Sequence, residues 1–182
     1  MKFTKVAVLL AVFALATVPM FGQLTATGTS QIKVVRTEWI SFSVTTALPT
    51  LTIPANSLTS NSDNVVVQTA WNLGPSHSTG VQVCVSAAGA LAGTGSNTDT
   101  IPVNEIFVTP KTGSPTALGS GTACGVAGAV AYTSYDTTTA AGRKNPTGTS
   151  ENIPVYVDLG SYANDVAVDT YTGTLNLVAY AN

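Results

Sequence analysis

The single histidine of the chain, His77, lies between two serines, Ser76 and Ser78. A Ser-His-Asp triad would have to use this imidazole as its general base. Triad partners converge from separate elements, however, and the G-x-S-x-G turn that presents a nucleophilic serine is missing from the sequence. We therefore interpret His77 as a solvated turn residue and expect no catalytic residues.

Metal-binding residues are also scarce. A zinc site needs three or four His, Cys or carboxylate ligands, and one histidine with two distant cysteines does not provide them at the required spacing. Asp165 and Asp169 could lie close together around a turn and bind calcium, but the sequence contains no D-x-[DN]-x-[DN]-G loop. We expect neither a metal site nor a cofactor.

Two further kinds of enzyme site find no support in the sequence. Nine acidic residues would allow a carboxylate pair of the glycosidase kind, but none of them lies in an aromatic-rich segment that would hold a sugar. The glycines lie in stretches rich in Thr and Ser rather than between a strand and a helix, so they do not predict a phosphate-binding loop. We therefore expect a protein that is not an enzyme.

The two tryptophans could bind carbohydrate, because exposed aromatic rings stack on sugar faces. Trp71 shares the parity of Val65 and Val67, which predicts that it lies in the core. Trp39 follows Glu38 in a less regular segment and is expected to be more open. Trp39 thus leaves a carbohydrate-binding module among the hypotheses.

The composition excludes several classes of protein. Only 9% of the 182 residues are charged, the formal net charge is −2 and the pI is about 5.1. A nucleic-acid-binding protein needs a basic face, and long surface helices need Glu, Lys and Arg, so neither is expected. An apolar content of 45% with a low net charge also argues against disorder.

The N-terminus has the pattern of a secretory signal peptide. Lys2 and Lys5 precede an unbroken apolar run over residues 6–16, which ends in the small-x-small sequence Ala14-Leu15-Ala16. The run is shorter than the roughly 20 residues that a membrane-spanning helix needs. An uncleaved membrane anchor is the alternative interpretation.

The expected organisation is a signal peptide over residues 1–22 and a single domain over residues 23–182. Cleavage is placed only between residues 16 and 26, because Gly22 and Ala26 also fit a cleavage site. We expect a protein that is secreted, periplasmic or on the cell surface, with no membrane span once the signal is removed.

The predicted export determines what redox state we expect for the two cysteines, Cys84 and Cys124. An even number of cysteines in an oxidising compartment predicts a disulfide between them. The alternative is two free buried thiols.

Alternating apolar residues predict β-strands through the rest of the chain. Residues 40–44 alternate, and a second apolar row runs from Val65 to Leu73. Gly74 and Pro75 then end the strand, because proline has no N–H for the ladder. Another row follows over residues 81–85, so we expect a hairpin over residues 64–86. Short strands are predicted at residues 105–109 and 130–135.

The C-terminal region predicts a second hairpin, with alternating rows over residues 153–159 and 171–179 around a turn at 160–165. Tyr171 could form a tyrosine corner, in which its hydroxyl bonds to backbone upstream, or simply pack on the hairpin. Long stretches rich in Thr, Ser, Gly and Asn separate the strands and could hide further strands. We expect a nearly all-β domain, an antiparallel β-sandwich.

The C-terminal region also resembles a known family. The run over residues 153–157, a turn, and the run over residues 169–177 (DTYTGTLNL) are similar to the final hairpin of secreted bacterial Ig-like domains of the spore coat protein U and Csu-pilin type. In that family a closing strand carries the pattern G-x-Y-x-G/D-T-L-x-V. The resemblance implies an Ig-like β-sandwich and a surface or pilus-like structural subunit.

The segment from Leu24 to Val35 has two interpretations, because Ile32 and Val34 alternate with polar residues. It is the first strand of a self-contained domain, which we favour, or a donor strand that completes the sheet of another subunit. We expect an exported, non-enzymatic structural or surface-assembly protein, such as a pilus-like or coat subunit, whose partners are itself or other surface subunits. The alternative is a secreted binding module for carbohydrate or for a surface partner.

Overall fold

The computed structural model describes residues 37–46, 50–54, 57–96, 98–160 and 166–182. The predicted signal peptide, its cleavage region and the segment from Leu24 to Val35 lie outside the described residues. Of the described residues, 49% are in strands and 4% in helices, which confirms the all-β prediction. None of the helices among them is long and apolar enough to cross a membrane.

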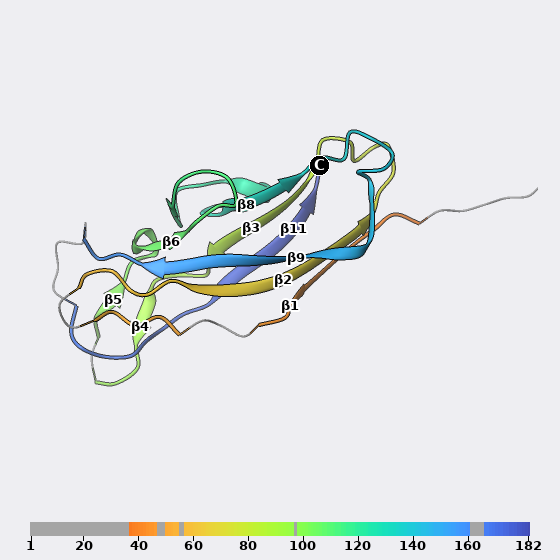
Figure 1. The fold of residues 1–182 in the computed structure, drawn as a ribbon. Coiled ribbons are helices and arrows are strands. Elements are labelled where there is room, and N and C mark those ends of the chain that lie inside the picture. Colours follow the sequence, from red (N-terminus) through yellow and green to blue (C-terminus); the bar gives the residue numbers. More distant parts are fainter. Residues whose placement is uncertain (1–36, 47–49, 55–56, 97, 161–165) are drawn as a thin grey trace, which may run out of the picture. The chain divides into compact units, whose positions relative to one another are not determined.

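Eleven strands and two short 3-10 helices follow one another along the described chain (Figure 1). They are β1 (Trp39–Val44), β2 (Asp63–Asn72), β3 (Val81–Ala87), β4 (Leu91–Gly93), β5 (Thr100–Ile101), η1 (Val103–Glu105), β6 (Ile106–Val108), β7 (Thr116–Ala117), η2 (Ala123–Gly125), β8 (Val130–Tyr135), β9 (Lys144–Val157), β10 (Tyr171–Thr172) and β11 (Leu175–Ala181).

The strands form three antiparallel sheets. One has five strands in the order β1-β2-β9-β6-β7, a second has the order β11-β3-β8, and a small third has the order β10-β4-β5. The first two sheets lie face to face, because their buried residues form one cluster. This arrangement is compatible with the predicted β-sandwich.

Both predicted hairpins are wrong, although the strands themselves are present. β2 pairs with β1 and β9, whereas β3 pairs with β11 and β8, so residues 73–80 cross from one sheet to the other. β9 and β11 are likewise in different sheets. A hairpin would set two apolar rows side by side on one uncovered face. The sandwich instead sets Val65 and Val67 against Val83 and Val85, which buries both rows.

The crossover over residues 73–80 contacts both ends of the described domain. His77 Nδ1 lies 3.0 Å from Glu38 Oε2, just before β1. The last residue, Asn182, donates its N–H to Gly80 O and accepts from Thr79 N. The Glu38 carboxylate packs directly against Gly74, so a side chain at this position would have to displace it.

Several strands lie where the sequence predicted only connections. β4, β5 and β7 have two or three residues each, too few to show a period. β9 begins at Lys144, inside a stretch rich in Thr, Gly and Asn, and its pairing with β2 shifts register between Thr69 and Trp71. The irregularity accommodates Pro146, which has no N–H, and Gly148, whose φ is 79°.

The core lies between the two larger sheets. Its buried members come from β2, β3, β6, β8 and β9, with Leu118 from the loop after β7: Val65, Val67, Val83, Val85, Ile106, Val108, Leu118, Val130, Tyr132, Ile153 and Val155. Beside this cluster, Trp71 is 3% exposed and packs with Leu73 and Val81. The expectation that Trp71 lies in the core is confirmed.

Tyr171 makes the upstream backbone bond of a tyrosine corner. Its hydroxyl donates to Ala167 O at 2.8 Å, four residues earlier. The residue begins β10, in the connection that leads from the end of β9 to β11. The bond therefore fixes the chain where it enters the small third sheet.

Candidate functional site

The contacts of His77 with Ser76 and Glu38 do not have the geometry of a catalytic triad. Ser76 Oγ lies 3.3 Å from His77 Nδ1, and Glu38 Oε2 lies 3.0 Å from the same nitrogen. In a triad the serine and the carboxylate meet opposite nitrogens of the ring. His77 is 38% exposed, and its contact with Glu38 joins the crossover to the residue just before β1.

Of the two aspartates considered for calcium binding, the structure describes only Asp169. Asp165 lies outside the described residues. Asp169 accepts hydrogen bonds from Thr170 N and Gly95 N, which fix the loop between β4 and β5. No group of three or more His, Cys, Asp or Glu residues among the described residues could hold a metal ion.

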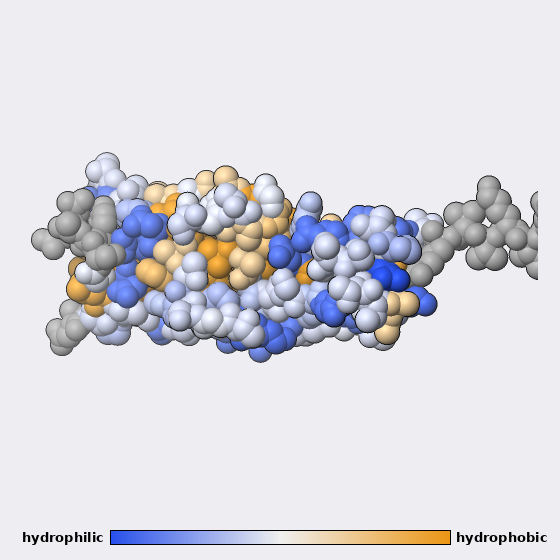
Figure 2. All heavy atoms as spheres, turned by 90° about the horizontal axis from the view of Figure 1, so that it is seen from above, coloured by the Kyte–Doolittle hydropathy of each residue, from blue (hydrophilic) through white to orange (hydrophobic). Residues whose placement is uncertain are grey.

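Cys84 and Cys124 form the predicted disulfide, which joins residues 40 positions apart. Cys84 lies on β3 and Cys124 lies in η2. The disulfide therefore fixes the loop after β7 to the outer side of the sheet β11-β3-β8. Figure 2 shows hydrophobic residues gathered over part of the side where this loop and β8 lie. In the same loop, Val126 is 36% exposed.

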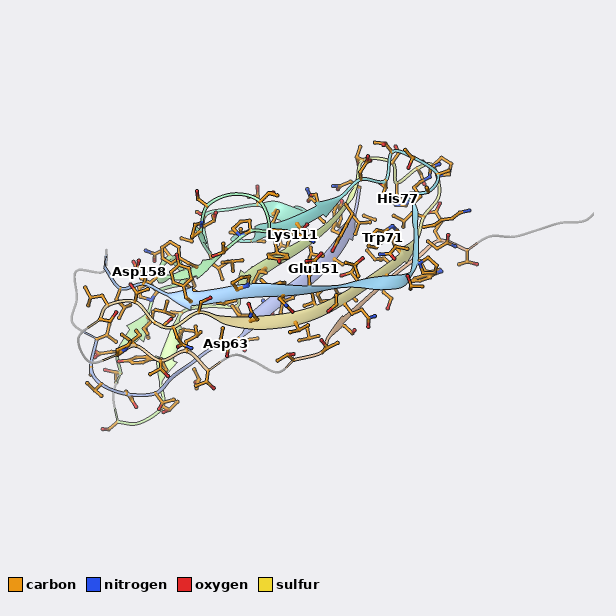
Figure 3. All side chains as sticks on the ribbon, viewed as in Figure 1. Asp63, Trp71, His77, Lys111, Glu151 and Asp158 are labelled. Atoms are coloured by element: carbon orange, nitrogen blue, oxygen red, sulfur yellow. A yellow bond between two sulfur atoms is a disulfide. The ribbon has the colours of Figure 1, made fainter. Side chains whose placement is uncertain are left out.

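A buried carboxylate at Glu151 forms the main polar cluster between the sheets (Figure 3). Glu151 is 5% exposed, and its Oε1 accepts hydrogen bonds from Lys111 Nζ and Tyr135 OH, both at 2.6 Å. Tyr135 in turn packs on Trp71, with ring centroids 4.9 Å apart. The cluster thus joins the loop after β6 to β8 and β9.

Sequence reasoning missed this cluster, although it left a signal. Glu151 has the same parity on β9 as Ile153, Val155 and Val157, all of which are buried. A carboxylate on the apolar face of a strand must find partners, because an unpaired buried charge is costly. Its partners could not be identified from the sequence, since Lys111 lies in a loop 40 residues away.

The cluster predicts a loss of stability at alkaline pH. The hydrogen bond to Glu151 raises the pKa of Lys111 above 10.5, and burial raises the pKa of Tyr132 and Tyr135 above 10.0. The unfolded chain therefore releases these protons at lower pH than the folded chain. The free energy of unfolding is expected to be unaffected by these groups below about pH 10 and to fall above it.

Urea unfolding followed by far-ultraviolet circular dichroism between pH 8 and pH 11.5 would measure this slope. The Tyr135→Phe variant removes one of the titrating groups and should show a shallower fall. A slope that is equal in both proteins would contradict the assignment to this cluster.

The two edge strands β1 and β11 are incompletely covered on their core-facing sides. The residues of β1 that share the core-facing parity are Ile40, Phe42 and Val44, which pair with the buried Trp71, Thr69 and Val67. Yet Ile40 is 38% exposed and Val44 is 49% exposed. The inner face of β1 is therefore only partly covered.

β11 shows the same incomplete cover on the other sheet. Its core-facing residues include Leu175, Leu177 and Ala179, which pair with Ala87, Val85 and Val83. All three are half-buried, whereas Val83 and Val85 are fully buried on the neighbouring strand.

β1 and β11 contact each other, so the two strands bound one side of the sandwich. We name this side the open edge. Among the described strands, β1 pairs only with β2 and β11 only with β3.

The opposite side of the sandwich is closed. There the loop after β7 inserts Leu118, which is 0% exposed, and Lys111 N donates to Tyr132 O of β8. The disulfide and the Glu151 cluster hold the same region. The open edge is thus a local feature of one side.

An edge strand presents backbone N–H and C=O groups that can pair with an added strand. At the open edge these groups border apolar side chains from both sheets, which would supply pockets for alternate side chains of an incoming strand. The arrangement is suited to β-strand addition. Comparison of the chain with protein-family models and with curated proteins finds no match to either.

Proposed function

We propose that the protein is an exported structural subunit that assembles at the cell surface by accepting a β-strand at its open edge. The observation that carries the proposal is the partial exposure of core-facing residues on β1 and β11, next to a closed opposite side. A sandwich with a missing strand gains stability when a partner covers that apolar surface.

The donor we propose is the segment from Leu24 to Val35 of another copy. Ile32 and Val34 would face the core, where the exposed inner faces of β1 and β11 lie. An extended strand rises about 3.3 Å per residue, so this segment is long enough to run beside all of β11. The same segment precedes β1 in every copy, so each subunit both donates and accepts.

The test compares the mature chain with the Ile32→Asp/Val34→Asp variant on an unboiled gel. The mature chain should form a ladder of bands, and the variant should run as a monomer because charges cannot enter the apolar edge. Gln31→Asp is the matched control, since the neighbouring position has the opposite parity. A wild-type chain without a ladder at any concentration would end the assembly hypothesis, as would a ladder that the Asp pair leaves unchanged.

A secreted binding module is the second candidate. Trp39 is 38% exposed, and Phe107 and Tyr156 stack at a centroid distance of 5.4 Å across β6 and β9. Both rings of this pair are half-buried on the outer side of the five-stranded sheet. Binding to polysaccharides that Trp39→Ala or Tyr156→Ala abolishes, in a chain that stays monomeric, would favour this candidate.

A further inference from the structure

The outer side of the five-stranded sheet carries side chains that neither the core nor the proposed assembly uses. Side chains alternate between the two sides of a strand, so the residues of β1, β2 and β9 next to the buried positions point away from the core. A strand added at the open edge would extend a sheet sideways and leave this side uncovered. We name it the outer face, and its residues used below are Trp39, Asn64, Gln68, Phe107, Asn152 and Tyr156.

Aromatic rings lie at both ends of the outer face. Trp39 is 38% exposed and pairs with Asn72, the last residue of β2. At the other end the Phe107 and Tyr156 rings stack with an interplanar angle of 14°. Each ring of a stack covers only one side of its neighbour, and Phe107 is flanked on β7 by the small Ala117. Both ends therefore offer aromatic surface.

The distance between the two ends follows from the register. Trp39 lies opposite Asn72, and Tyr156 follows Val155, which lies opposite Asp63. The two aromatic ends are thus separated by almost the full length of β2, about 30 Å at the usual rise of about 3.3 Å per residue. A ligand that contacts both ends must be a polymer rather than a single sugar.

Exposed amides lie between the aromatic ends. Asn64 and Gln68 are on β2, and Asn152 lies opposite Val66 on the neighbouring strand β9. The side chains of these three residues make no hydrogen bond to another residue that the structure describes. Each amide has two N–H donors and an oxygen acceptor. The middle of the outer face can therefore pair with ligand hydroxyls in either sense.

The outer face lacks charge between its ends. Among the outward-pointing residues of β1, β2 and β9, only Lys144 is charged, and it lies at the Trp39 end. Asp158 lies just beyond Tyr156 at the other end. The described domain has three basic and eight acidic residues, a formal charge of 3 − 8 = −5. An anionic polymer would be repelled by the domain, and a cationic polymer would find no carboxylate along the middle of the face.

We infer that the outer face binds a neutral polysaccharide in an extended form. The C–H faces of its sugars stack on Trp39 and on the Phe107–Tyr156 pair, and its hydroxyls pair with the amides between them. This assigns a site and a ligand class that the assembly function does not need, because the open edge takes no part in it. In an assembled polymer the face would repeat, and many weak contacts would add to a firm attachment.

The test measures retention of the mature chain on three insoluble neutral polysaccharides: cellulose, chitin and β-1,3-glucan. All proteins carry the Ile32→Asp/Val34→Asp pair, so that binding reports single copies rather than polymers. Trp39→Ala and Tyr156→Ala remove the rings at the two ends. Gln68→Ala removes an exposed amide in the middle, and far-ultraviolet circular dichroism checks that each variant keeps the fold.

The matched control is Tyr180→Ala. Tyr180 is 45% exposed, and it pairs with Gln82 at a position between the core-facing residues of β11, so it points outward from the other large sheet. Alginate gel is the anionic control and should retain none of the proteins.

At least one neutral polysaccharide should retain the parent protein. Trp39→Ala and Tyr156→Ala should each weaken its binding about tenfold, the factor for one lost stacking contact. The double variant should weaken it about a hundredfold, because the two rings are far apart and act on the same ligand. Gln68→Ala should weaken binding about threefold, and Tyr180→Ala should leave it unchanged. Raising NaCl from about 0.1 M to about 1 M should not release the protein, since screening acts on charges.

Retention on none of the neutral polysaccharides would overturn the inference, as would retention on alginate alone. A loss of binding in Tyr180→Ala equal to that in the two ring variants would also overturn it, because any exposed aromatic would then serve. Each of these outcomes leaves the assembly function standing, since that function is measured separately by the ladder of the chain without the Asp pair.

Discussion

A chain in which Cys84 and Cys124 are both replaced by alanine is expected to be less stable by about 4 kcal/mol. The disulfide closes a loop across 40 positions, and its loss restores the freedom of that loop in the unfolded chain. Alanine is preferred to serine because Cys84 is 1% exposed and a hydroxyl there would need a partner. Urea unfolding of both proteins at pH 7 measures the difference.

The wild type with its disulfide reduced is the natural control, because it keeps both cysteine side chains. It should lose about as much stability as the double variant. A loss below about 1 kcal/mol in both would show that the loop after β7 stays ordered in the unfolded chain or adds little to the fold.

The Lys111→Met variant is expected to lose about 2 kcal/mol. Methionine keeps most of the apolar stem of the lysine but leaves the Glu151 carboxylate, 5% exposed, with one hydrogen bond fewer. The half-exposed Lys111 is solvated in part, so the loss is smaller than for a fully buried pair. Chemical unfolding at pH 7 is the measurement.

Two further variants show whether the stability loss of Lys111→Met comes from the lost ion pair or from the loss of any lysine side chain. Lys144→Met, at an exposed lysine, should change stability by less than about 0.5 kcal/mol. The double variant Lys111→Met/Glu151→Gln should recover part of the loss, because a neutral amide is cheaper to bury than a carboxylate. Equal losses of stability for Lys111→Met and Lys144→Met would show that the Lys111–Glu151 pair does not contribute to the free energy of unfolding.

The sequence predicted strands better than their pairing. The alternating rows around Val65, Val83 and Ile153 identified β2, β3 and β9, because alternation follows from burial of one strand face. Burial of a face does not say which strand lies beside it, and both hairpins predicted from proximity in the chain were wrong. A crossover of only eight residues, 73–80, looks in sequence like a long hairpin loop.

The candidate site was predictable only in part. The disulfide followed from two cysteines and a predicted export signal, and the buried Trp71 followed from its parity. The open edge did not, because Ile40 and Leu177 look like ordinary core residues in a strand pattern. Their exposure depends on the sheet order, in which no other described strand lies beyond β1 or β11.

The crossover over residues 73–80 has a mechanical consequence. It holds Glu38 at the start of β1 and Asn182 beyond β11, so both ends of the domain lie at the same place. A pull applied between these two points would peel β1 from β2 and β11 from β3, breaking their hydrogen bonds one at a time. A pull transmitted along a strand lying beside the whole of β11 would instead load all of its hydrogen bonds in shear at once. The same domain would then be weak to tension across its own ends and strong to tension passed along a fibre.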